Sequence, residues 1–142
     1  MTQLLDRLAD TSSRHRIAYR RRRIEQLLAD SAYFADDDRL VMEQIYRHQI
    51  PLREVAVLLK CTPRALQFRV KALLGRTREP LFRFVVDHRE LVPSHLEAIA
   101  RRYVLEGRSL RQTARTTGQS LHGVRMGIQD MKTRARCWFS KY

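Results

Sequence analysis

Apolar residues recur every three or four positions along almost the whole chain, and few residues interrupt them. Five glycines and four prolines are spread over 142 residues. A spacing of three or four is that of a helix with one buried face. Hydrophobic residues make up 44% of the sequence, enough to bury a core in a chain of this length. The sequence therefore predicts an all-α globular fold.

The first expected helix is basic. After a short leading segment that contains Leu4, Leu5 and Leu8, Ser12 and Ser13 offer N-caps for a helix that ends near Asp30. Its apolar side is predicted to carry Ile17, Ile24, Leu27 and Leu28, and its other side Arg14, Arg16 and Arg20 to Arg23. Residues 1–35 thus form an N-terminal basic helical segment. The arginines either follow a phosphate backbone or form an ordinary solvated face.

Three helices are expected in residues 36–78. Asp36, Asp37 and Asp38 place negative charge at the start of the first, which is predicted to bury Leu40, Val41, Met42 and Ile45 and to end before Pro51. Two shorter helices are predicted at about 52–59 and 62–74. Gly75 is the expected C-terminal glycine cap, and Pro80 breaks any further helix. The first unit is therefore expected to end there.

A second series of helices follows a linker helix at 81–91, within a linker segment at 79–92. Residues 93–142 are predicted to contain a helix that Gly107 stops near residue 106, a helix at about 109–117, and a long helix from Ser120 toward Arg136. An aromatic tail with Trp138, Phe139 and Tyr142 ends the chain. We expect Trp138, like Met42, to belong to the core.

The two series form an internal repeat. When Leu52 is aligned with Leu110, the alignment continues without a gap and places Thr62 on Ser120. Few residues are identical, but their roles agree. In each series a predicted N-cap is followed by apolar residues at the same helical positions, Leu66, Val70 and Leu73 in the first and Val124, Ile128 and Met131 in the second.

The spacing within each series is that of a helix-turn-helix. Two helices that cross closely favour a small residue on the first, here Ala56 and Ala114, and the turn four residues later favours glycine, here Gly118. Lys60 occupies that turn in the first unit. A lysine in a left-handed conformation costs about 1 kcal/mol, so this turn is expected to be strained or differently shaped. The predicted fold class is thus all-α, with two tandem tri-helical helix-turn-helix units joined by a linker helix and preceded by an N-terminal basic helix.

The second unit resembles region 4 of bacterial sigma factors in the segments "RRYVLEGRSLRQTA", "TTGQS" and "VRMGIQDMK", within residues 91–136. The first unit resembles it more loosely in "IYRHQIPLREVAVLLKCT" and "ALQFRVKALL". The resemblance implies binding of double-stranded DNA at a promoter element and, as a further partner, RNA polymerase. No segment resembles sigma region 2, so a complete sigma factor is not expected.

The geometry of a helix predicts which residues would contact bases. With Leu66, Val70 and Leu73 inward, the side chains on the opposite face of that helix point to solvent. The same positions recur in the second unit. Arg and Lys suit guanine, Gln suits adenine, and Phe or Met can meet a thymine methyl group. The candidate base-reading residues are Arg64, Gln67, Phe68, Lys71, His122, Arg125, Met126 and Gln129.

Other residues suit the phosphate backbone. Arg53 and Arg111 begin the preceding helices, and Thr62 and Ser120 begin the reading helices, where backbone contacts set the docking register. The alternative is that all these faces are merely solvated. An exposed Phe68 would instead suit packing between the two units or between subunits.

Gly123 and Gly127 lie inside a predicted helix of the second unit. Either that helix approaches a backbone closely, or the second unit, with its Thr113, Thr116 and Thr117, is less stable.

The net charge of the chain favours a polyanionic partner, of which nucleic acid is the leading candidate. Lys and Arg outnumber Asp and Glu by 28 to 15, a net charge of +13, of which residues 94–142 hold +7. The start of the chain lacks the apolar core of a signal peptide, and no stretch is apolar over about 20 residues, so a cytoplasmic, nucleoid-associated protein without membrane contact is expected. Cys61 and Cys137 have no metal spacing and are expected to be reduced.

The sequence favours a DNA-binding transcription regulator of a bacterium or phage, with no cofactor, no metal and no catalytic residues. An accessory DNA-binding module of a recombination, transposition or plasmid system is one alternative, and a sigma-like factor that grips another protein is a second. Monomer and homodimer both remain open.

Overall fold

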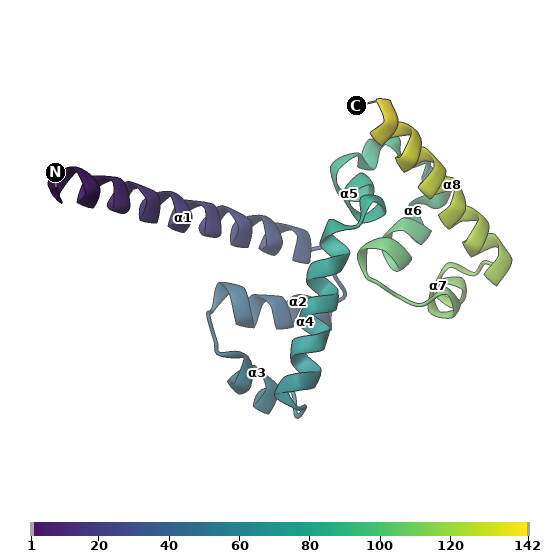
Figure 1. Ribbon diagram of the computed structural model, residues 1–142. Coiled ribbons are helices and arrows are strands. Elements are labelled where there is room, and N and C mark those ends of the chain that lie inside the picture. The colour runs from purple at the N-terminus through teal and green to yellow at the C-terminus, as the bar shows by residue number, and fades with distance from the viewer. Residues whose placement is uncertain (1, 142) are drawn as a thin grey trace.

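The computed structural model describes the backbone of residues 2–141 and the side chains of that range other than those of residues 2, 4–6, 8–10 and 12. All regular elements in this range are helical, which confirms the predicted all-α class (Figure 1). In chain order they are α1 (Thr2–Ser31), α2 (Asp36–Met42), η1 (Glu43–Arg47), α3 (Leu52–Leu58), α4 (Pro63–Arg78), α5 (Pro80–Asp87), η2 (Arg89–Leu91), η3 (Ser94–Leu96), α6 (Glu97–Ile99), η4 (Ala100–Leu105), α7 (Leu110–Thr117) and α8 (Leu121–Lys141).

Helix α1 is one uninterrupted helix, so the predicted start at Ser12 and Ser13 is wrong. A serine caps a helix only where the preceding backbone leaves the helical conformation, and no glycine or proline before it forces that here. The side chains of Leu4, Leu5 and Leu8 lie outside the described residues. Helix α1 projects from the rest of the molecule and meets it only near its C-terminal end (Figure 1). Ile17, on the predicted apolar side of this helix, is accordingly 64% exposed.

Helices α2, α3 and α4 enclose a small core formed by Val41, Val55, Ala56, Leu66 and Val70. The helix that starts at α2 continues through the π-helical segment η1 before it ends ahead of Pro51. Leu40 is 47% exposed, so its predicted burial is wrong. Successive residues on a helix diverge by about 100°, and with Val41 and Met42 both buried, Leu40 lies on the outside.

Helix α4 continues through Gly75 to Arg78, so Gly75 is not the predicted C-terminal cap. Proline disfavours the helical conformation in the residue before it, and Glu79, which precedes Pro80, has an extended backbone with ψ 136°. The proline thus ends α4, one turn later than the glycine would have done. Helix α5 then begins at Pro80 itself and is shorter than the predicted linker helix, because the 3-10 turn η2 replaces its last part.

The C-terminal elements pack around α5. Segments η3, α6 and η4 form one nearly continuous helical stretch that ends where Gly107 takes φ 71°. Ser109 and Gln112 form a reciprocal capping box at the start of α7, and Gly118 ends α7 with φ 68°. Helix α8 extends to Lys141, beyond the predicted end near Arg136, and Trp138 on it packs against the core. Tyr142 lies outside the described residues.

A larger core joins the N-terminal and C-terminal helices. Phe34, Met42 and Leu73, which precede α5 in the chain, belong to the same buried cluster as Phe82, Phe84, Val85, Leu96, Ile99, Val124 and Met131. The rings of Phe34 and Phe82 are 6.0 Å apart between centroids. The two halves of the chain therefore share a core. No helix in the described range is long and apolar enough to span a membrane.

Candidate nucleic-acid interface

The turn between α3 and α4 and the turn between α7 and α8 have the same backbone hydrogen bonds at equivalent positions of the repeat. The Cys61 amide donates to the Ala56 carbonyl at 3.0 Å, and the Gln119 amide donates to the Ala114 carbonyl at 3.1 Å. The residue before each donor is left-handed, Lys60 with φ 55° and Gly118 with φ 68°. Lys60 thus adopts the strained conformation that glycine adopts without cost in the second turn.

The N-caps of α4 and α8 also correspond. The Ala65 amide donates to the Thr62 hydroxyl at 3.1 Å, and the Gly123 amide donates to the Ser120 hydroxyl at 3.0 Å. Both hydroxyl oxygens therefore act as acceptors at the caps. A hydroxyl that accepts in this way keeps its own proton free to donate, and both residues are exposed. The predicted phosphate role of Thr62 and Ser120 is compatible with capping.

The correspondence extends upstream into the two π-helical segments. The backbone amide of His48 donates to the Glu43 carbonyl, and the backbone amide of Glu106 donates to the Arg101 carbonyl, both at 3.0 Å. The left-handed residues that follow, Gln49 with φ 53° and Gly107 with φ 71°, again occupy equivalent positions of the repeat. Each series thus repeats its backbone path from the end of its first helix to the start of its third.

The predicted reading face on α4 is entirely exposed. Leu66, Val70 and Leu73 are buried on one side of the helix, and the opposite side carries Arg64, Gln67, Phe68 and Lys71. Phe68 is 60% exposed, which excludes packing between the two halves of one chain. The Arg64 guanidinium lies over its ring, 5.6 Å from the centroid. In the described part of the chain, neither Arg64 nor Lys71 forms an ion pair, so both cations are available to a ligand.

The corresponding face on α8 has the same arrangement. Val124, Ile128 and Met131 are buried, while His122, Arg125, Met126 and Gln129 are exposed. Met126 is 56% exposed at the position that Phe68 occupies on α4. Arg125 has no acidic partner among the described residues. Each face therefore combines one amide, one uncovered apolar side chain and at least one cation that forms no ion pair in the described range.

Arg53 and Arg111, at the second residue of α3 and α7, are likewise exposed and without an acidic partner in the described range. Arg69 differs from these arginines although it is also exposed on α4. Its guanidinium donates to Asp38 Oδ1 twice, at 2.8 and 3.0 Å, and this bond joins α4 to α2. Arg69 thus forms a structural ion pair, whereas Arg64 on the same helix has no acidic partner in the described range.

Close packing explains why glycine occurs at position 127 inside α8. A Cβ atom on it would lie 2.7 Å from Ile99 Cδ1 and 3.1 Å from Leu96 Cδ2, so α8 needs glycine to approach the η3–α6 helix. The close neighbours are side chains rather than a backbone. Gly123 meets only the capping Ser120 hydroxyl, at 3.2 Å, and the Gln119 side chain beyond it. Thr113 is fully buried at the position of Val55, and its hydroxyl has no hydrogen-bond partner among the described residues.

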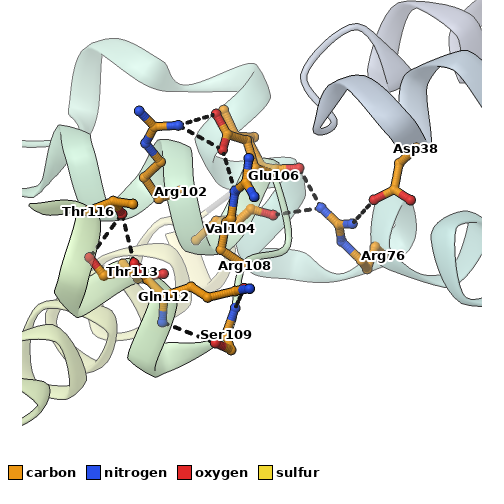
Figure 2. Close-up of polar contacts among 11 residues, drawn as sticks. Asp38, Arg76, Arg102, Val104, Glu106, Arg108, Ser109, Gln112, Thr113 and Thr116 are labelled. Carbon is orange, nitrogen blue, oxygen red and sulfur yellow. Dashed lines mark hydrogen bonds and ion pairs between the residues drawn. The ribbon is translucent and has the colours of Figure 1, made fainter.

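Arg76 is a structural residue that the sequence did not reveal (Figure 2). From α4 its guanidinium donates to the Leu105 carbonyl and, at 3.5 Å, to the Val104 carbonyl at the end of η4. It also lies 4.0 Å from Asp38 Oδ2 and 4.8 Å from the centroid of Phe34. Burial lowers the pKa of Arg76, and the carboxylates of Asp38 and Glu79 oppose that shift. One side chain thus connects α2, α4 and η4.

The loop that receives Arg76 is held by its own ion pairs. Glu106 accepts from Arg102 at 3.2 Å and from Arg108 at 3.1 Å on either side of Gly107 (Figure 2). A Cβ atom on Gly107 would overlap the Arg76 guanidinium. The left-handed backbone favours glycine here, which the sequence indicates. A side chain at this position would also displace the Arg76 guanidinium, which the sequence does not indicate.

The described residues contain no cluster of side chains that could bind a metal ion. No group of three or more His, Cys, Asp or Glu side chains there could hold a metal ion. Cys61 is half-buried and Cys137 exposed, and both are free thiols. Comparison of the chain with protein-family models, with curated proteins and with solved structures gave no match.

Proposed function

We propose that this chain is a sequence-specific regulator of transcription that binds double-stranded DNA. In this proposal residues 36–78 and 93–142 are two tandem helix-turn-helix units, joined by the segment at 79–92. Helices α4 and α8 enter successive major grooves, and the first turns of α3 and α7 contact the phosphates. The protein carries out no reaction and needs no cofactor or metal.

One observation carries the proposal. Two helices with equivalent caps and equivalent preceding turns expose, at matching positions of the repeat, the side-chain types that recognise base edges. Buried residues lie at matching positions on the opposite side of each helix, so packing against the core holds each exposed face in place. A net charge of +13 supplies the general attraction to the phosphate backbone.

Selection from a random pool of duplex DNA tests the proposal. The intact chain should enrich a site with two dissimilar halves whose centres lie about 10 bp apart. The halves should differ because Arg64, Gln67 and Lys71 offer other donors and acceptors than His122, Arg125 and Gln129. A variant that carries both Arg64→Ala and Arg125→Ala is the matched control and should lose the enrichment. Failure of the intact chain to enrich any sequence would contradict the proposal.

A second function, binding of a protein such as RNA polymerase through the same faces, is favoured by the exposure of Phe68 and Met126. An uncovered aromatic side chain beside an arginine also suits a protein interface. Phe68→Ala distinguishes the two functions. If it weakens DNA binding only at sites with thymine opposite that position, Phe68 reads bases. If DNA binding is unchanged and polymerase binding is lost, the face is a protein contact.

A further inference from the structure

A groove separates α1 from the body of the molecule. It has a volume of about 1150 Å³ and lies between one face of α1, from Ser13 to Asp30, and side chains of η1, α4 and α5. We call it the α1 groove. Its apolar lining comes from Ile17, Ile24 and Leu27 on α1, and from Tyr46 and Leu74 opposite. Leu27, Tyr46 and Leu74 are half-buried and pack against the core, so this part of the groove is built on fixed side chains.

The exposed charged side chains that line the α1 groove are all positive. Arg16, Arg20, Arg23 and Arg78 line it and are exposed. Its one acidic residue, Asp30, is 3% exposed and is bonded through both carboxylate oxygens to Arg83. Of the five arginines in the lining, Arg83 is thus bonded to Asp30, and the other four are exposed beside no other carboxylate of the lining. This arrangement attracts an anionic partner and disfavours a cationic one.

The exposed part of α1 leaves apolar side chains uncovered. Ile17 is 64% exposed and Tyr19 is 62% exposed, while the last turns of the same helix are packed. Most helical stability in proteins comes from tertiary packing of an amphipathic face. The projecting part of this 30-residue helix therefore leaves Ile17 and Tyr19, on opposite sides of α1, for another molecule to cover.

We propose that the α1 groove binds an acidic amphipathic helix of another protein. Such a helix presents an apolar stripe, which matches Ile17, Ile24 and Leu27, and carboxylates beside the stripe, which match the flanking arginines. A nucleic-acid backbone would satisfy the arginines and leave the apolar side chains in water. A second copy of this chain, docked through α1, would bring arginine against arginine. The site is separate from the reading faces of α4 and α8.

The length of the groove sets the length of the partner. Residues 13–30 of α1 span about 27 Å at 1.5 Å per residue. The probe is therefore a labelled synthetic peptide of about 18 residues with leucines at every third or fourth position and glutamates elsewhere. Its control is a peptide of the same composition, scrambled so that the leucines do not share a face. Fluorescence anisotropy against the intact chain measures the affinity of each.

Variants of exposed residues locate the binding. Ile17→Ser and Arg20→Glu should each weaken binding of the amphipathic peptide by about tenfold or more. Arg22→Glu, which makes the same charge change on α1 outside the groove lining, should weaken it by less than about twofold. Far-UV circular dichroism of each variant shows whether α1 remains helical, so that a loss of binding is assigned to the groove.

Three results would overturn the proposal. Equal affinity for the scrambled peptide would show that charge alone attracts the ligand. Nucleic acid would be shown to occupy the groove if a single-stranded oligonucleotide of equal charge displaced the peptide and bound the Ile17→Ser variant as tightly as the wild-type chain. Self-association in sedimentation velocity that Ile17→Ser abolishes would show that a second copy does. None of these measurements depends on whether α4 and α8 read DNA.

Discussion

Arg83 donates hydrogen bonds to both carboxylate oxygens of Asp30, at 2.7 and 3.2 Å, across a sequence separation of 53. The pair fastens the last turn of α1 to α5. The Asp30 side chain is 5% exposed and also accepts from Gln26 at 3.1 Å, so little water reaches its charge. This contact and the packing of Leu27 against the core both hold the C-terminal end of α1, which lines the α1 groove.

The first prediction concerns that pair. Arg83→Met leaves the buried Asp30 carboxylate without its main partner and should lower the free energy of unfolding by about 3 kcal/mol. Asp30→Asn in the same chain removes the orphaned charge and should recover part of the loss. Urea unfolding of the two single variants and the double variant gives the coupling energy. A loss below about 1 kcal/mol for Arg83→Met would show that water replaces the bond.

The second prediction compares two glycines inside helices. A Cβ atom at Gly75 meets nothing within 4 Å, so Gly75→Ala should raise the free energy of unfolding by about 0.8–1 kcal/mol through helix propensity alone. Gly127→Ala gains the same propensity but forces a methyl group against Ile99 and Leu96, and overpacking costs about 1–3 kcal/mol. It should therefore destabilise. Thermal unfolding of both variants side by side decides the signs.

The third prediction separates base contacts from phosphate contacts. Arg64→Ala and Arg125→Ala should each weaken binding to the selected site by about 1–3 kcal/mol and relax its sequence preference. Arg53→Ala and Arg111→Ala should weaken binding to the selected site and to random DNA alike. Gel-shift titrations on both DNAs make the comparison. If the first pair of variants affected both DNAs equally, the assignment of the reading faces would be wrong.

The fourth prediction concerns Arg76. Its bonds to the η4 carbonyls hold α4 against the second series of helices, so the two reading helices should keep one separation. Insertion of a few base pairs between the halves of the DNA site should therefore abolish tight binding by the wild type. Arg76→Ala should tolerate the insertion better and bind the uninserted site less tightly. Equal spacing dependence in both proteins would contradict this role.

A matched variant probes the same contact from the other side. Gly107→Ala places a methyl group where the Arg76 guanidinium lies, and φ 71° is unfavourable for alanine. It should broaden the spacing preference as Arg76→Ala does. The double variant should then be little worse than either single variant, because both changes break one contact.

The fifth prediction is the dependence of affinity on salt. The logarithm of the association constant should fall linearly with the logarithm of salt concentration, with a slope of about −0.9 for each phosphate neutralised. Arg53→Ala and Arg111→Ala should each reduce that slope by about 1. Titrations at several potassium chloride concentrations give the slopes. A nearly flat dependence would favour the protein-binding function over DNA binding.

The features that were predictable from the sequence are local. The caps at Thr62 and Ser120, the stop at Gly107 and the left-handed turn at Gly118 each follow from the chemistry of one or two residues. The burial of Leu66 and Val70 follows from the helical period. The exposure of the candidate reading residues follows from that burial, because the two sets lie on opposite sides of one helix.

The features that were missed depend on competition or on distant partners. Gly75 and Pro80 both favour the end of α4, and only the finished helix shows that the proline decides. The bonds of Arg76 to the η4 carbonyls and of Arg83 to Asp30 join residues 28 to 53 positions apart, which no periodic pattern marks. The same holds for the contact of His88 with Trp138, whose ring centroids lie 4.4 Å apart.

The shared core also determines the order in which the chain can fold during synthesis. A ribosome that has added Arg78 has made the whole of the first three-helix group, yet Phe34, Met42 and Leu73 still lack the later side chains that bury them. Until α5 is made, Phe34 lacks the Phe82 ring that lies 6.0 Å from it, and apolar surface left uncovered in this way is prone to aggregation. An N-terminal half that is made alone therefore lacks part of the core that it shares with the C-terminal half.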